Sequence, residues 1–300
     1  MITINPPLET TGMMMVIAPP RLARQLEAAE RDAWLDMYRA APPSYAVEFQ
    51  LEIRWVREVL LCLSRVIPFS LFNRALGLGL FAPADERLLD RVLAVLQRAA
   101  EHAFLINYVP SSDPPELKQW LRARDLEESA SWDRIFRGSQ PLPTAESEAC
   151  DEFSLERVTQ RSASEWADFL VEQYRVPVKP WLMALVDRTG WRHYLLRRGA
   201  QIMAVRSVHL SDNGMVWSGL EAPAPGDTTQ LFDMDFLLVQ GIIRRCSDRG
   251  MRYFVADIER PSITRDTSVY RNYARLGFRR AYRRGNFVPA AGTDPMKIWP

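Results

Sequence analysis

Hydrophobic and polar positions along the chain form two successive series of predicted elements. In the first series, alternation at period two predicts half-buried strands, and recurrence at helical spacing predicts amphipathic helices. This series comprises strands at 48–55, 59–63, 70–81 and 103–109 and helices at 21–40, 85–101 and 114–124. The helix at 85–101 is the clearest, because its apolar residues share one face and its charges cover the other.

The second series follows a polar, proline-containing stretch, Gly138–Glu148, which has the composition of a linker. It comprises strands at 153–158, 191–197, 201–210, 215–220, 253–258 and 278–282 and helices at 164–174, 179–186, 235–249 and 268–276. Although the two series share no recognisable sequence repeat, their element order is alike. We therefore expect an α+β fold in two copies, with domains at 1–137 and 150–300 joined by a linker at 138–149.

Composition narrows the class of protein. Of the 300 residues, 47% are apolar and 25% charged, and the net charge of +1 provides no field for recruiting nucleic acid or an anionic membrane. The three cysteines, Cys62, Cys150 and Cys246, form no metal-binding or disulfide pattern. No apolar run reaches the length of a membrane span. We expect a soluble, cytoplasmic protein without a metal site, and the excess of arginine over lysine suggests a bacterial source.

One segment near the C-terminus carries a resemblance to a known family. In Ser268–Tyr282, Tyr273 precedes Gly277-Phe278 by four residues at the predicted junction of a helix and a strand. This pattern resembles the last helix and strand of the N-acetyltransferase (GNAT) superfamily. Phe72–Gly79 resembles part of a degenerate first copy in two-copy members. The resemblance implies two tandem GNAT-like domains that form an internal pseudo-dimer, each a twisted mixed sheet flanked by helices.

The resemblance also implies a site for acyl-CoA, such as acetyl-CoA. The cofactor would lie in a split between the strands at 215–220 and 253–258, with Trp217, Gly219 and Leu220 along the pantetheine arm and Asn272 nearby. Its pyrophosphate would meet a loop of the form Gln/Arg-x-x-Gly-x-Gly/Ala. Counting back along the long helix puts Gln230–Asp235 on this motif, so that Gln230 matches but Asp233 and Asp235 replace the small residues. Carboxylates there would repel a pyrophosphate.

Several residues have both a chemical and a structural interpretation. By resemblance, Tyr273 would protonate the leaving thiolate, and Glu259, at the end of a strand, would accept a proton from the amine. Packing of a buried aromatic ring and hydrogen bonding to the next loop are the structural alternatives. Asp233 and Asp235, with Asp227 and Glu221, could bind a cation or a basic substrate, or could simply favour a helix start.

The leading interpretation is an acyl-CoA-dependent N-acyltransferase acting on a small amine. The alternative is a GNAT-derived protein that no longer binds acyl-CoA. Such a protein would serve as a binding or regulatory module, or as an enzyme for a non-CoA substrate.

Overall fold

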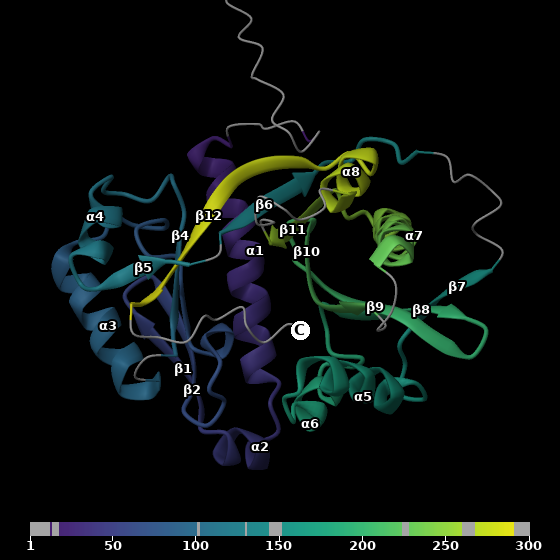
Figure 1. Cartoon of the computed structure of the whole chain (residues 1–300), viewed down its shortest axis with the longest axis horizontal. Coiled ribbons are helices and arrows are strands. Elements are labelled where there is room, and N and C mark those ends of the chain that lie inside the picture. Colours follow the sequence, from purple (N-terminus) through teal and green to yellow (C-terminus); the bar gives the residue numbers. More distant parts are fainter. Residues whose placement is uncertain are drawn as a thin grey trace, which may run out of the picture. The chain divides into compact units, whose positions relative to one another are not determined.

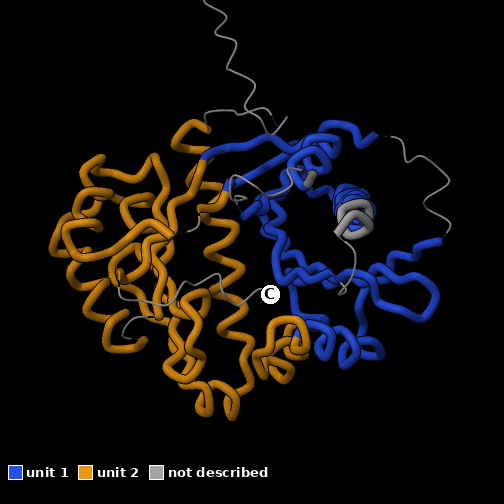
Figure 2. Tube along the Cα trace, in the orientation of Figure 1, with its two compact units in different colours: residues 1–17, 133–170, 186–282 blue, residues 18–132, 171–185, 283–300 orange. Residues whose placement is uncertain are grey.

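A computed structural model describes residues 13, 18–100, 103–129, 131–143, 152–223, 228–259 and 268–290; the side chains of 228–233 and 268 lie outside the described part. It divides into two compact units, each built from separate stretches of the chain (Figure 2). Unit 1 comprises Met1–Ile17, Asp133–Leu170 and Val186–Tyr282. Unit 2 comprises Ala18–Trp132, Val171–Leu185 and Arg283–Pro300.

Unit 2 is a mixed sheet between helices. Its strands run in the order β1, β2, β3, β4 and the last part of β12, and β5 also pairs with β12. Only β3 and β4 pair in parallel; the other neighbours are antiparallel. The strands are β1 (Leu51–Val56), β2 (Val59–Ser64), β3 (Arg74–Leu76), β4 (Leu105–Tyr108), β5 (Leu126–Glu128) and β12 (Arg279–Pro289). The helices are α1 (Pro20–Arg39), α2 (Pro43–Glu48), the 3-10 turn η1 (Ser70–Phe72), α3 (Glu86–Ala100), α4 (Leu117–Arg122) and α6 (Lys179–Met183).

Helices α1 and α3 cover β2 from opposite sides (Figure 1). Every residue of β2 is buried. Leu61 and Leu63 share a core cluster with α3, while Cys62 lies near Tyr38 of α1. A strand covered on both faces shows a continuous apolar run and no alternation, which explains the pattern at 59–63.

Unit 1 contains the other strands. They run in the order β12 (its residues 279–282), β6, β11, β10, β9, β8 and β7. The strands are β6 (Trp132–Arg137), β7 (Phe153–Arg157), β8 (Trp191–Arg198), β9 (Gln201–Leu210), β10 (Met215–Pro223) and β11 (Tyr253–Glu259). The helices are α7 (Thr228–Ser247), α8 (Ser268–Arg275) and most of α5 (Ala163–Tyr174), whose residues 171–174 belong to unit 2.

The two faces of the unit 1 sheet have different covers. Helices α7 and α8 share a core cluster with β8, β9, β10 and β11, whereas Trp166 of α5 contacts His193 on the other face, with ring centroids 4.2 Å apart. Gly241 allows α7 to approach β7, because a Cβ there would lie 2.4 Å from the Leu155 side chain. At the end of α8, Gly277 has a φ of +82° and Phe278 is buried, as the motif predicts.

The units cross the expected division of the sequence. Most of β6 precedes the expected linker but belongs to unit 1, whereas residues 283–289 of β12 come from the second series but belong to unit 2. Each segment completes the sheet of the other series. The compact units therefore do not coincide with the expected domains at 1–137 and 150–300. That these two stretches are copies of one domain stays a prediction.

Several expected elements were wrong in extent. The last strand ends at Pro289 and not at residue 282, because it goes on to pair with β4. Pro43 starts a short helix, so the first strand begins at Leu51 and not at residue 48. The run at 70–81 contains only a three-residue strand, because Gly77 and Gly79 turn the chain with φ of +88° and +68°. The long helix begins at Thr228, seven residues before the expected start at Asp235.

A buried ionic network fastens α1 to the sheet of unit 2. Arg74 on β3 donates to Glu30 Oε1 at 2.9 Å, and Arg284 on β12 pairs with Glu30 and Glu27, the latter at 3.4 Å. These four side chains are no more than 2% exposed. Asn107 extends the network by donating to Asn286 at 2.9 Å.

Replacing Glu30 with glutamine should lower the free energy of unfolding by about 3–5 kcal/mol, because two buried guanidinium groups lose their shared countercharge. Urea unfolding measures this change. The control is Glu52→Gln, which breaks the exposed pair with Arg54 and should cost at most about 1 kcal/mol. Equal, small effects for both variants would contradict the stabilising role of the network.

Candidate active site

Strands β10 and β11 separate partway along their length. They pair in parallel at Met215↔Tyr253, Val216↔Phe254 and Trp217↔Val255. Beyond Trp217, β10 continues to Pro223 and β11 to Glu259 without further pairing between these described residues. The sheet of unit 1 is therefore open between the last residues of these strands, and their backbone groups there are free of each other.

A β-bulge in β10 lies beside this opening. Gly219 pairs with Ser207 and Ala222 with Val205, so Leu220 and Glu221 both lie opposite Arg206 of β9. Leu220 has a φ of +47°, which costs a non-glycine residue about 1–2 kcal/mol. The surrounding contacts must hold this conformation, and such strain is commonest at functional sites.

Arg206 joins the bulge to α7. Its guanidinium donates to Ser218 Oγ at 3.0 Å and to Asp235 Oδ1 at 2.8 Å, and it forms an ion pair with Glu221. The Arg206 side chain is only 5% exposed, so these charge-assisted contacts replace its water. The positive charge between the carboxyl groups of Asp235 and Glu221 is therefore the guanidinium group of Arg206.

Tyr273 of α8 lies within the influence of the same charges. It is 3% exposed, and its ring meets Phe278 edge to face at 5.0 Å. Burial raises the pKa of its phenol well above the ordinary value, against the lowering effect of the Arg206 guanidinium. The hydroxyl is therefore protonated at neutral pH and can act as a proton donor.

Glu221 is the group in this cluster whose charge changes near neutrality. Although 42% of its side chain is exposed, the surrounding protein removes enough water to raise its pKa from 4.5 to about 7. Arg206 opposes this shift, and Asp235 and Asp257 add to it. A carboxyl group that titrates near pH 7 has the pKa expected of a general base.

A second ion pair lies on β11. Asp257 pairs with Arg134 of β6 at 3.1 Å; Arg134 is fully buried, and Asp257 is 20% exposed. Two residues on, Glu259 is exposed at the end of β11. On β10, the Trp217 ring lies over Gly219, where a Cβ would come within 2.3 Å of it. Asn272 is partly buried on α8.

The expected extended segment at 230–235 is wrong, because these residues lie in α7. Asp233 and Asp235 therefore do not share a face in the way that extended backbone would allow. The side chains of Gln230 and Asp233 lie outside the described residues, as does the whole of Asp227. A loop at the start of α7 would fall at residues 224–227, which include Gly226 and also lie outside the described part.

Sequence reasoning brought Tyr273, Asp235 and Glu221 into consideration but missed Arg206. An arginine flanked by Ala204, Val205, Ser207 and Val208 is unusual in a buried strand, and this was the available signal. The sequence also gave no reason to connect Arg134, which precedes the expected linker, with Asp257.

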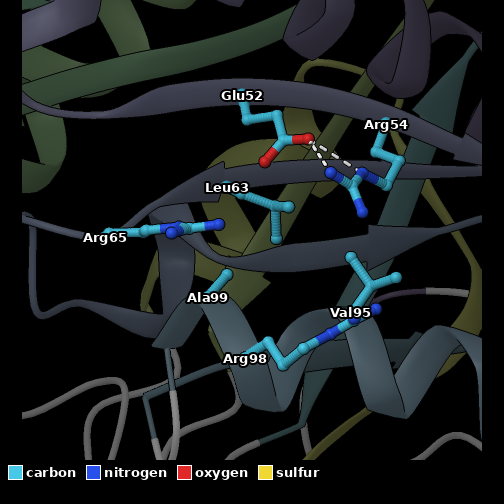
Figure 3. A pocket seen from close by; sticks show the side chains of 7 residues that line it. All are labelled: Glu52, Arg54, Leu63, Arg65, Val95, Arg98 and Ala99. Atoms are coloured by element: carbon cyan, nitrogen blue, oxygen red, sulfur yellow. Dashed lines mark hydrogen bonds and ion pairs between the residues drawn. The ribbon is translucent and has the colours of Figure 1, made fainter.

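Unit 2 contains a pocket of different character. It lies between β1, β2 and α3 and is lined by Glu52, Arg54, Leu63, Arg65, Val95, Arg98 and Ala99 (Figure 3). Glu52 accepts from Arg54 Nε at 2.8 Å. This pocket lacks the coupled acid and base found beside β10.

Within the described residues, no cluster of three or more His, Cys, Asp or Glu side chains could hold a metal ion. No helix in the same part of the chain is long and apolar enough to cross a membrane.

No protein-family profile matches the chain, and no curated protein sequence is similar to it. Several solved structures are similar in fold. A GCN5-related N-acetyltransferase from Kribbella flavida aligns over 90% of this chain and 96% of its own, with a TM-score of 0.59 and 13% identity. Another, from Sphaerobacter thermophilus, aligns over 92% and 96%, with a TM-score of 0.54 and 16% identity. A conserved protein of unknown function from Staphylococcus epidermidis aligns over 82% and 97%, with a TM-score of 0.52 and 8% identity.

These similarities extend over both series of elements. The chain has the fold of the GCN5-related N-acetyltransferases, the GNAT superfamily.

Proposed function

We propose that the chain is an acyl-CoA-dependent N-acyltransferase whose reaction takes place at the opening between β10 and β11. The observation that carries the proposal is the convergence at this opening of a protonated phenol, Tyr273, and a carboxyl group that titrates near neutrality, Glu221. Beyond Trp217, the edge of β10 that faces away from β9 no longer pairs with β11, and this edge is suited to hydrogen bonding with the pantetheine arm of acetyl-CoA, alongside Gly219 and Leu220.

The proposed chemistry uses one proton acceptor and one proton donor. The carboxylate of Glu221 takes a proton as the amine nitrogen attacks the thioester carbonyl and forms the C–N bond. The C–S bond then breaks, and the Tyr273 hydroxyl supplies the proton that the leaving thiolate needs. Arg206 has a positioning role, because it holds Glu221 beside the bulge. Glu259 is the alternative proton acceptor.

The substrate we propose is a small amine. Four carboxyl groups, Glu221, Asp235, Asp257 and Glu259, are carried by β10, α7 and β11; Arg206 pairs with Glu221 and Asp235, and Arg134 pairs with Asp257. Carboxyl groups at the opening would favour a cationic amine. We propose that the pyrophosphate binds at the start of α7, because the first N–H groups of a helix have no partner within it and the helix dipole favours an anion. Asp235 lies seven residues after Thr228, the first residue of α7, and is paired with Arg206. Its charge therefore does not oppose a pyrophosphate at the start of the helix.

The two units support the proposal of two GNAT-like copies. In each, an antiparallel pair of strands leads to a parallel pair joined through a long helix: β2, β3, α3 and β4 in unit 2, and β9, β10, α7 and β11 in unit 1. The strand β3 has only three residues. Unit 2 would then be the degenerate copy.

One observation favours the alternative, a GNAT-derived protein without acyl-CoA binding. Between Gly219 and Gly250 the sequence has no Gly-x-Gly, and Gly241 serves the packing of α7 against Leu155. Such a protein would use the opening for another ligand or serve as a binding partner.

Calorimetric titration with acetyl-CoA tests the choice. The proposal expects binding, and no heat at millimolar acetyl-CoA would favour the alternative.

Where binding is found, thiol release with a panel of primary amines measures turnover. Tyr273→Phe should slow turnover by about 10²–10⁴-fold with little change in affinity, because only the proton donor is lost. The control Tyr253→Phe removes the hydroxyl of a residue on β11 that is 44% exposed, and it should leave turnover and affinity unchanged. Equal turnover in the two variants would remove Tyr273 from the mechanism.

The raised pKa of Glu221 predicts a pH dependence of stability that needs no substrate. Between pH 4.5 and about 7 the folded state binds more protons than the unfolded state, so the free energy of unfolding should fall as pH rises through this window. Urea unfolding at several pH values measures the slope. Glu221→Gln should make the slope less negative, whereas Glu172→Gln, at an exposed position of α5, should not. An unchanged slope in Glu221→Gln would contradict the assignment.

A further inference from the structure

Three arginines lie around Tyr194 in unit 1, and the charge of a fourth, Arg249, acts on one of them, Arg192. Arg157 of β7 lies opposite Tyr194 in the β7–β8 ladder, and Arg192 precedes Tyr194 by two residues, so it points to the same face. The guanidinium carbon of Arg245, near the end of α7, lies 5.8 Å from the centre of the Tyr194 ring. Arg245 Nη2 also donates to the Leu155 carbonyl of β7 at 2.6 Å. Arg249 follows in the turn after α7. We call these four residues the arginine cluster.

The arginine cluster is separate from the opening between β10 and β11. It lies at the start of β8 and the end of α7, whereas the opening lies past Trp217 and near Asp235, in the first half of α7. Asp235 and Arg245 are ten residues apart on this helix, which corresponds to about 15 Å. The proposed acyl transfer therefore makes no use of the cluster.

The charges of the arginine cluster are poorly balanced. The Arg192 guanidinium is partly buried; burial first, and then the charges of Arg157 and Arg249, lower its pKa. Its Nη1 donates only to the neighbouring Trp191 carbonyl, at 2.5 Å. Arg157 has one carboxylate partner, Asp187, at 3.7 Å. Among the described residues, neither Arg192 nor Arg249 has an ion pair.

Two donors of the cluster also lack acceptors. The Nε atoms of Arg157 and Arg192 are buried and have no hydrogen-bond partner in the described part of the chain. A buried donor without an acceptor and a crowd of like charges are both unfavourable. An anion bound between the guanidinium groups would remove both costs.

We propose that the arginine cluster is a binding site for a phosphate group, either inorganic phosphate or a phosphate monoester. Guanidinium groups bind phosphate through paired N–H donors, and a dianion with several acceptor oxygens can serve more than one arginine at once. A phosphate here would accept from the unpaired donors of Arg157 and Arg192 and lie within the field of Arg249. A single carboxylate supplies fewer oxygens and only one charge.

Calorimetric titration of the full chain with inorganic phosphate tests this site, with chloride at equal ionic strength as the reference. The expected dissociation constant is about 1 mM or tighter. Arg192→Gln should weaken binding by roughly 10-fold or more, because a charge-assisted contact is lost. The control is Arg244→Gln, on the same helix; Arg244 is exposed and is not among the charges that act on Arg192, so binding should change less than about 2-fold.

Thermal unfolding separates a binding role from a structural one. Without phosphate, Arg192→Gln should be at least as stable as the unchanged protein, because it relieves repulsion. With phosphate, only the unchanged protein and Arg244→Gln should gain stability. Phenyl phosphate then identifies the source: tighter binding than inorganic phosphate indicates a monoester, and equal binding indicates phosphate itself. No binding beyond the chloride reference, or equal loss in both variants, would overturn the proposal.

Discussion

The burial of Arg206 is the constraint on which the candidate active site depends. A guanidinium group cannot lose its water without charged or polar partners, and here they come from two elements: Ser218 and Glu221 on β10 and Asp235 on α7. These contacts fasten the bulge of β10 to the first half of α7. They also surround Glu221 with the charges that, together with burial, set its pKa.

The bulge and the separation of the strands are connected. With two residues of β10 opposite one of β9, the strand bends just after its last pair with β11, at Trp217. Leu220 takes a left-handed conformation to allow this bend. The opening is therefore a consequence of how β10 and β9 are paired, supported by the ionic contacts of Arg206.

Both units use buried ion pairs to hold a helix to a sheet, but with different results. In unit 2, Glu27 and Glu30 of α1 meet Arg74 and Arg284, and all four side chains are shielded from water. In unit 1, Glu221 is partly exposed, so its carboxyl group can exchange protons with a substrate. The difference in exposure, more than the residue types, separates a structural network from a candidate site.

The sequence by itself determined most of the order of elements and the helix end at Gly277-Phe278, because these follow from local periodicity and turn chemistry. It misjudged the start of α7, since helix boundaries depend on contacts beyond the local pattern. Only the tertiary structure decided that Asp235 pairs with Arg206. It also decided that β6, from the first series, joins the sheet of unit 1 and that the end of β12, from the second series, joins the sheet of unit 2. Those pairings join residues far apart in the chain, and no local pattern encodes which distant charge or strand edge a segment will meet.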